Sequence, residues 1–239
     1  MSDRSAARVA VIVQARMSSS RLPGKVLMDL GPGSTLELLT RRLRRVAEAD
    51  ALVVATSVDE SDDAVAAAAS DLGVSVFRGP LADVLERYRL AAAETGCEGV
   101  VRITADCPLA EPAVIDRLVA AWREDSGLEY VWNTREPRSF PDGLDVEVVS
   151  RRALEEAAGE TSEPYDREHV TPFVRDRPER FRRLSLRLEP PARGVKLSLD
   201  TPEDLATIRS FVDEVGPDAD LAVIAAAAGG RSDARMVAG

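Results

Sequence analysis

A cluster of cationic and hydroxyl side chains follows the first apolar run of the chain, Val9–Val13. Residues 14–25 read QARMSSSRLPGK, which places Arg16, Arg21 and Lys25 in one segment with three consecutive serines. Positive charges, hydroxyls and backbone N–H groups at the end of a buried strand are the groups that bind polyphosphates. The three cations could therefore neutralise much of a triphosphate.

The lysine of this loop carries further information. Lys25 and Lys196 are the only lysines in a chain whose other basic residues are arginines. A compact ammonium suits a point contact with phosphate, whereas a guanidinium is a planar fork. The loop is not a Walker A sequence, because Val26 follows the lysine and Ser19 stands where the first glycine would be. A basic surface loop that only caps the strand is the alternative.

Two aspartates stand directly after other predicted strands. Asp106 follows Gly99–Thr104, and Asp200 follows Val195–Ser198 and precedes a helix start. Ligands of open α/β sheets bind at the carboxyl ends of the strands, so the two carboxylates could face each other there. Two carboxylates with phosphate oxygens and water suit Mg²⁺, which would stabilise charge at phosphorus. The alternatives are a turn residue at Asp106 and a helix-cap support at Asp200.

Polar residues between positions 133 and 169 are candidates for binding a second substrate. They are Asn133, Asp142, Asp145, Glu147 and His169. Asp145 and Glu147 are two positions apart, so a strand would place them on one face. There they could bind sugar hydroxyls or form a solvated face. His169, the only histidine, could be a catalytic base, a structural residue or a contact between subunits.

The composition limits the possible partners. The chain has 239 residues and a formal charge of −10, which opposes binding to nucleic acid or to an anionic membrane. An anionic ligand must therefore be held by local positive charge. Cys97 and Cys107 form neither a disulfide framework nor a metal-binding spacing. Neither a signal core nor an apolar run of membrane-spanning length is present, so we expect a cytoplasmic protein.

The elements that would position these residues are short strands alternating with amphipathic helices. Strands are predicted at 9–14, 51–56, 74–77 and 99–104, and helices at about 35–46, 61–72, 81–95 and 111–122. A capping box of Ser34 and Glu37 starts the first helix, Ser61 could cap the second, and Gly96 closes the third. This order predicts an α/β fold with a parallel sheet and right-handed crossovers.

The pattern changes after residue 129. Segment 130–188 combines short strands, proline turns and modest helices, which we interpret as a small inserted α+β subdomain. The chain is then one domain, 1–239, with a core of about 8–129 and 189–228. The sheet should resume near residues 195–198, and Thr201 should cap a helix that Pro202 opens. Residues 229–239 are small and polar, which predicts a frayed tail.

Together, these segments resemble the cytidylyltransferase family of the spore coat polysaccharide biosynthesis protein F type. That family is related to the synthetases that activate sialic acids and 3-deoxy-manno-octulosonate as CMP-sugars. The resemblance extends from about Val9 to Val215. The segments that carry it are 14–25, 55–57, 77–79, 83–88, 102–109, 141–147, 166–172 and 200–204.

The resemblance implies a nucleotide-diphosphosugar transferase fold, which is Rossmann-like, with a mixed, mostly parallel sheet and helices on both faces. It implies that Arg16, Arg21 and Lys25 hold the triphosphate of CTP and are catalytic, and that Asp106 and Asp200 bind the metal. It places further residues around the nucleotide: Ala15, Ser18, Ser19 and Thr104, with Thr56, Ser57, Arg78 and Asp83 near the base and ribose.

The expected activity is Mg²⁺-dependent transfer of CMP from CTP to an acidic sugar or related small anionic acceptor, with release of pyrophosphate. Sugar phosphates and phosphonates belong to that acceptor class. Two alternatives stay open, a glycosyltransferase that uses a nucleotide-sugar donor and a non-catalytic nucleotide-binding protein. We expect Trp132 and Phe140 to be exposed and to mediate a homodimer, with neither nucleic acid nor membrane as partner.

Overall fold

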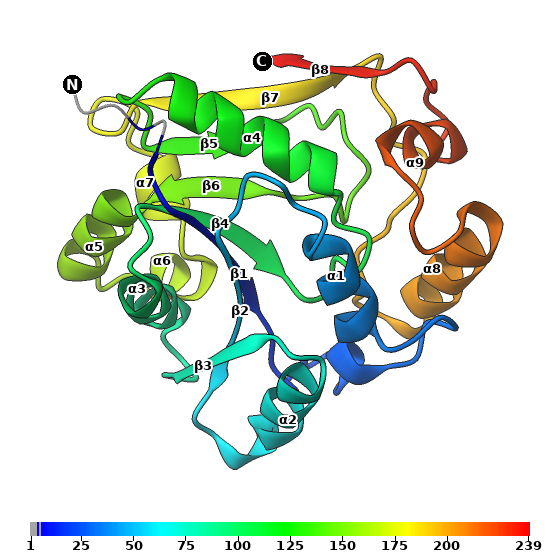
Figure 1. Cartoon of the computed structure of the whole chain (residues 1–239), viewed down its shortest axis with the longest axis horizontal. Coiled ribbons are helices and arrows are strands. Elements are labelled where there is room, and N and C mark those ends of the chain that lie inside the picture. The colour runs from blue at the N-terminus through cyan, green and yellow to red at the C-terminus, as the bar shows by residue number, and fades with distance from the viewer. Residues whose placement is uncertain (1–3, 5) are drawn as a thin grey trace.

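The computed structural model describes Arg4 and residues 6–239, and its centre is an eight-stranded sheet ordered β3-β2-β1-β4-β6-β5-β7-β8 (Figure 1). The strands are β1 (Val9–Gln14), β2 (Ala51–Ser57), β3 (Ser75–Gly79), β4 (Gly99–Thr104), β5 (Tyr130–Trp132), β6 (Glu147–Ser150), β7 (Arg183–Glu189) and β8 (Arg235–Ala238). All run in one direction except β6 and β8. The predicted α/β fold with a mostly parallel sheet is therefore confirmed.

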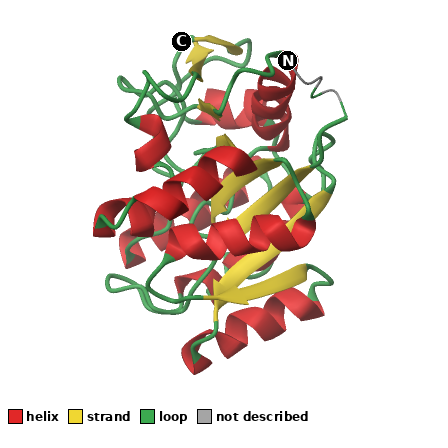
Figure 2. Cartoon of the chain, turned by 90° about the vertical axis from the view of Figure 1, so that its left-hand side faces the viewer, coloured by secondary structure: helices red, strands yellow, loops and turns green. Residues whose placement is uncertain are grey.

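Helices cover both faces of the sheet (Figure 2). Residues of β1 alternate between the two cores: Val9, Val11 and Val13 belong to one, and Ala10 and Ile12 to the other. The first core includes α1 (Thr35–Leu43), α2 (Asp63–Asp71), α4 (Pro112–Glu124), α8 (Pro202–Val215) and α9 (Leu221–Ala227). The second includes α3 (Val84–Thr95), α5 (Arg151–Glu160) and α7 (Pro172–Arg175), and α6 (Pro164–His169) packs against α3 and α7. Because β1 is buried on both faces, its sequence is a continuous apolar run.

Most helix ends lie where local chemistry predicts them. Ser34 and Glu37 form the capping box of α1, and Gly96 ends α3 with a φ of 65°. The prediction that Ser61 caps α2 is wrong. A 3₁₀ turn, η2 (Glu60–Asp62), precedes this helix, and the Ser61 N–H donates to the Asp59 carboxylate instead. Asp59 therefore caps the 3₁₀ turn, and α2 begins after that turn, at Asp63.

Segment 130–188 adds β5, β6 and β7 to the same sheet as β1–β4. The division into a core and an inserted subdomain stays a prediction. The strand expected at 195–198 is absent; one isolated bridge joins Lys196 to Asp142 there. Its partner is a turn at Gly143 (φ 100°), where a Cβ would lie 2.4 Å from the Leu197 carbonyl carbon. A glycine turn brings the two backbones together but offers only one residue for pairing.

Two further expectations are wrong. The tail predicted to fray ends in β8, which pairs with β7 and covers an edge that would otherwise be unpaired. Trp132 and Phe140 are not an exposed surface: they are 8% and 2% exposed, and Trp132 stacks on Tyr130. Among the described residues, no helix is both long and apolar enough to cross a bilayer.

Candidate active site

A cleft of about 360 Å³ lies at the carboxyl ends of β1 and β4. Its wall combines the loop after β1, the end of β4, the end of α6 and the residue that precedes the cap of α8. The lining includes, among the residues expected at the site, Arg16, Ser18, Ser19, Arg21, Lys25, Thr104, Asp106, His169 and Asp200. The tertiary structure thus brings the cationic loop and both aspartates to one cavity.

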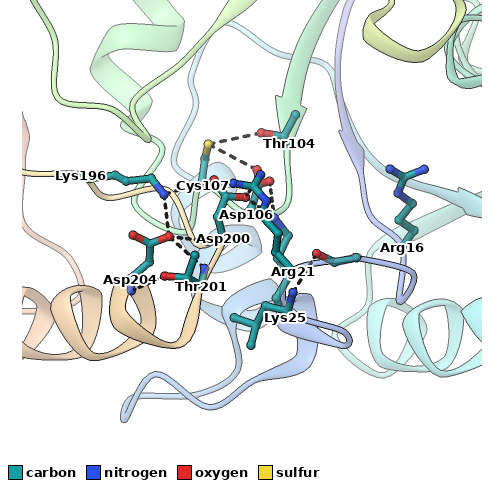
Figure 3. A network of polar contacts seen from close by, with 12 residues as sticks. Arg16, Arg21, Lys25, Thr104, Asp106, Cys107, Lys196, Asp200, Thr201 and Asp204 are labelled. Atoms are coloured by element: carbon teal, nitrogen blue, oxygen red, sulfur yellow. Dashed lines mark hydrogen bonds and ion pairs between the residues drawn. The ribbon is translucent and has the colours of Figure 1, made fainter. Parts of the chain in front are cut away.

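The Lys25 ammonium lies between the two aspartates (Figure 3). Its Nζ donates to Asp106 Oδ2 at 2.7 Å and to Asp200 Oδ1 at 3.0 Å. The Lys25 side chain is only 12% exposed, so water screens these contacts weakly. Arg21 Nη2 donates to the same oxygen of Asp200 at 2.9 Å, but this arginine is 64% exposed. The carboxylates therefore converge on one buried cation.

Local backbone geometry fixes the position of Lys25. Gly24 has a φ of 73°, a left-handed conformation that glycine adopts without strain, and its N–H donates to the Met17 carbonyl at 3.0 Å. The 3₁₀ turn η1 (Lys25–Leu27) starts there. The Met17 N–H donates to Asp62 Oδ1 at 2.7 Å, which ties the loop to the turn before α2. The ammonium thus projects from a constrained loop.

A backbone hydrogen bond brings the second aspartate to the first. The Leu199 N–H donates to the Asp106 carbonyl at 2.8 Å, so Asp200 follows directly beside Asp106. Burial alone would raise the pKa of Asp200, but hydrogen bonds and charge from Lys25 and Lys196 outweigh it and lower this pKa. Asp200 is therefore an anion at neutral pH.

A second cavity of about 210 Å³ adjoins the cleft. Arg102, Thr104 and His169 line both cavities and thus form their junction. Asp145 and Glu147 both line the second cavity, as their spacing of two positions predicts. The rest of its wall is Thr134, Tyr165, Thr171, Pro172 and Arg175. A ligand in this cavity would lie next to a ligand in the cleft.

The floor of the second cavity is a buried polar network centred on Glu147. Its carboxylate accepts from Arg102 Nη1 at 2.5 Å, from Thr171 Oγ1 at 2.7 Å and from the Tyr130 hydroxyl. Burial would raise the pKa of Glu147, but Arg102 and the hydroxyl donors outweigh it and lower this pKa. Asp145 pairs with Arg138, yet burial keeps its pKa above the ordinary value. The network orients Arg102 toward the junction.

His169 ends α6 and lines both cavities. Its ring packs against Tyr165, with the centroids 4.4 Å apart. The next residue, Val170, has a φ of 73° although it is β-branched and buried, which is a strained conformation. This bend turns the chain between His169 and Thr171 so that both line the second cavity.

Several residues expected around the nucleotide do not line the cleft. The Ser57 hydroxyl donates to Asp62, and Arg78 donates to the carbonyls of Ser57 and Asp59 and pairs with Asp63. Asp83 caps α3 and pairs with Arg167. Ala15 and Thr56 are buried. Internal hydrogen bonds already use the polar groups of Ser57, Arg78 and Asp83, and their contact with a nucleotide stays a prediction.

Two residues expected to bind the acceptor, Asn133 and Asp142, line neither of these cavities. The buried Asn133 amide donates to the Leu144 carbonyl at 2.7 Å and accepts from the Val146 N–H at 2.9 Å. Its side chain therefore completes the turn between β5 and β6. Asp142 lines a separate hollow beside Lys196.

Sequence reasoning assigned no role at the site to several lining residues: Gln14, Arg102, Tyr165, Glu168, Thr171 and Arg175. For Arg102 a signal exists. Arg102 and Thr104 interrupt the apolar strand Gly99–Thr104 at alternate positions, which places both on one face near its carboxyl end. For Lys196 the sequence also contains a signal, because it stands only four residues before Asp200, which its Nζ contacts at 3.2 Å.

Comparison with known proteins gives the family. A family model described as cytidylyltransferase matches residues 10–218. The chain belongs to the cytidylyltransferase family. It is 33% identical to the spore coat polysaccharide biosynthesis protein SpsF of Bacillus subtilis over 222 residues, 89% of this chain and 90% of that protein. The resemblance inferred from the motifs is thereby confirmed, and the protein is a nucleotidyltransferase.

Solved structures agree with this assignment. A cytidylyltransferase from Leptospira borgpetersenii superposes with a TM-score of 0.85 at 32% identity, covering 90% of each chain. A CMP:2-keto-3-deoxy-manno-octonic acid synthetase solved in complex with CTP superposes with a TM-score of 0.65 at 16% identity, covering 87% of this chain and 99% of that one. The second likeness shows the shared fold.

Proposed function

We propose that this cytidylyltransferase moves CMP from CTP to a small anionic acceptor, such as an acidic sugar, a sugar phosphate or a phosphonate, and releases pyrophosphate. The observation that carries the proposal is the position of Lys25 Nζ, within 3.0 Å of both Asp106 and Asp200 and at the base of a cationic loop. A nucleotide triphosphate and a divalent cation both suit that arrangement.

The loop after β1 would bind the triphosphate. Arg16 is 40% exposed and its contact with Glu168 is 3.4 Å long, so phosphate oxygens can replace that partner at little cost. Arg21 is similarly free to exchange Asp200 for phosphate. Lys25 and the two arginines would then stabilise the negative charge that develops on the pyrophosphate leaving group.

The two aspartates fit Mg²⁺. The Lys25 ammonium already occupies a point that one oxygen of each carboxylate reaches. Within Arg4 and residues 6–239, three or more His, Cys, Asp or Glu residues never group closely enough to hold a metal. Mg²⁺ needs no larger protein cage, since it binds through one or two carboxylates plus substrate phosphates and water. When bound, the ion would neutralise charge on the reacting phosphate.

The second cavity would hold the acceptor. Its hydroxyl groups from Thr134, Tyr165 and Thr171 suit a polyhydroxylated ligand, and Arg175 suits an acidic group. Its junction with the cleft at Arg102 would position the acceptor oxygen for in-line attack on the α-phosphorus. An acceptor phosphate is already ionised and needs no base. For a hydroxyl acceptor, His169 stands at the junction as a candidate base.

A pyrophosphate-release screen tests this proposal. CTP, ATP, GTP and UTP are each combined with sugar acids, sugar phosphates and phosphonates, with Mg²⁺ or with EDTA. The expected result is release with CTP, Mg²⁺ and one acceptor class, and a loss on the order of 100-fold in Asp106→Asn and Asp200→Asn. Turnover in EDTA, or full Mg²⁺-dependent activity in either variant, would reject the metal role. Light scattering tests the homodimer, which stays a prediction.

A further inference from the structure

The chain's other lysine contacts the same carboxylate as Lys25 does. Lys196 Nζ donates to Asp200 Oδ2 at 3.2 Å, whereas Lys25 and Arg21 donate to Oδ1 at 3.0 and 2.9 Å (Figure 3). Both lysines in a chain that otherwise uses arginine therefore converge on one aspartate. The two oxygens of Asp200 have different partners, and only Oδ1 shares its partner Lys25 with Asp106.

Lys196 reaches Asp200 from outside the cleft. It lines a separate hollow of about 240 Å³ that also includes Arg138, Asp142 and Arg193, and it is not part of the cleft wall. Lys196 therefore acts on the cleft through Asp200. By position it is a positioning residue, not a catalytic one.

The start of α8 holds Lys196 and Asp200 in one rigid unit. Asp204 Oδ2 accepts from Lys196 Nζ at 2.6 Å, from the Asp200 N–H at 2.9 Å and from the Thr201 N–H at 3.0 Å. Thr201 and Asp204 also form the capping box of the helix. The Asp200 backbone thus binds the Asp204 carboxylate directly, and Asp200 Oδ2 is linked to the same carboxylate through the Lys196 ammonium. These contacts limit rotation of the Asp200 side chain.

We propose that Lys196 withholds Oδ2 of Asp200 from a bound cation, so that Asp200 offers one oxygen, and that this favours Mg²⁺ over Ca²⁺. The inference rests on the proposed function, in which Asp200 is a metal ligand. Mg²⁺ demands a near-ideal octahedron and uses few protein oxygens, whereas Ca²⁺ takes six to eight and readily binds a carboxylate through both oxygens. When Lys196 occupies Oδ2 of Asp200, the binding of Ca²⁺ is therefore weakened more than the binding of Mg²⁺.

If Lys196 acted only through its positive charge, the affinities for the two cations would change in a different way. An ammonium near the site repels any divalent cation, and its removal would strengthen the binding of Mg²⁺ and Ca²⁺ together, because both carry two charges. The ratio of the two affinities cancels that effect. It changes only if Lys196 controls which oxygens of Asp200 are available.

Titration calorimetry with α,β-methylene-CTP, which cannot transfer CMP, measures this ratio. The affinity of the full chain for the analogue is determined in Mg²⁺, in Ca²⁺ and in EDTA. In Lys196→Met the ratio of the analogue's affinity in Mg²⁺ to its affinity in Ca²⁺ should fall about tenfold. Mutation of a residue that supports a metal ligand typically costs about 10- to 100-fold in metal affinity, and this expectation takes the lower end. Arg193→Met, which removes a cation from the same hollow, should keep the ratio of the parent. A ratio within twofold of the parent in Lys196→Met overturns the proposal.

The experiment separates this proposal from the function on which it rests. In Asp200→Asn the ratio of the analogue's affinity in Mg²⁺ to its affinity in EDTA should fall at least about tenfold; a ratio within twofold of the parent's would reject Asp200 as a ligand. If Asp200→Asn loses the metal effect while Lys196→Met keeps the parental ratio, only the role of Lys196 fails. Thermal unfolding checks that each variant is folded. Lys196→Gln replaces Lys196→Met if the latter is unfolded, with the same criteria.

Discussion

Replacement of Lys25 by methionine tests the centre of the site, because it keeps an apolar stem and removes the ammonium. The contacted oxygens of Asp106 and Asp200 lie 2.7 and 3.0 Å from Nζ, so they are at most 5.7 Å apart. At such a separation two like charges repel by roughly 1–3 kcal/mol, from bulk water to a partly buried protein site. We therefore expect the free energy of unfolding at pH 7 to fall by about 2 kcal/mol.

The same variant has a defined pH dependence. The pKa of Asp200 is lowered in the folded protein because Lys25 and Lys196 outweigh the effect of burial. A carboxylate with a lowered pKa stabilises the fold above its unfolded pKa, about 3.9, and loses that contribution as the pH falls through the folded value. Loss of Lys25 moves the folded pKa back toward the ordinary value. The stability difference between parent and Lys25→Met should therefore be complete above about pH 5 and vanish in stronger acid.

Urea unfolding at several pH values measures the stability difference, and pyrophosphate release measures the rate. Turnover of Lys25→Met should fall on the order of 100-fold, since the ammonium acts on developing charge. The exposed Arg21→Met is the matched control, with a stability change within about 0.5 kcal/mol. Parental stability at pH 7 would refute the electrostatic role of Lys25. A destabilised variant with near-parental turnover would instead remove Lys25 from catalysis.

Three other predictions concern the surrounding structure. Glu147→Gln leaves Arg102 without its buried counterion and should cost about 3 kcal/mol in urea unfolding, against less than about 0.5 kcal/mol for the exposed Glu168→Gln; equal losses would contradict this. Ser34→Ala removes the cap of α1 and should cost about 1 kcal/mol without changing turnover; a slower reaction would link α1 to the site. Burial raises the pKa of the Cys107 thiol, so disulfide reagents should label it on the order of 100-fold more slowly in the native protein than in urea, and rapid native labelling would disprove its burial.

The polar side chains that hydrogen-bond within the fold show what a motif match leaves open. A motif match gives the identity and order of residues such as Ser57, Arg78 and Asp83, but it does not reveal which polar groups the fold itself consumes. Each of the three is satisfied by neighbouring protein atoms. Arg102 is the converse case, because its pairing with Glu147 joins β4 to β6, which are adjacent in the sheet although 45 residues separate the two in sequence.

The sequence by itself determined β1 and β4, the cationic loop between Arg16 and Lys25, and the capping boxes at Ser34 and Thr201. Apolar periodicity and hydrogen bonds within one turn set these features, so neighbouring residues contain the whole cause. Tertiary structure alone decided how Asp106, Asp200 and Lys25 meet. Asp200 reaches Asp106 through a backbone hydrogen bond from Leu199, not through the strand that the sequence suggested. The contacts of Lys25 with Asp106 and Asp200 span 81 and 175 positions. They depend on how the entire chain packs, so neighbouring residues in the sequence do not determine them.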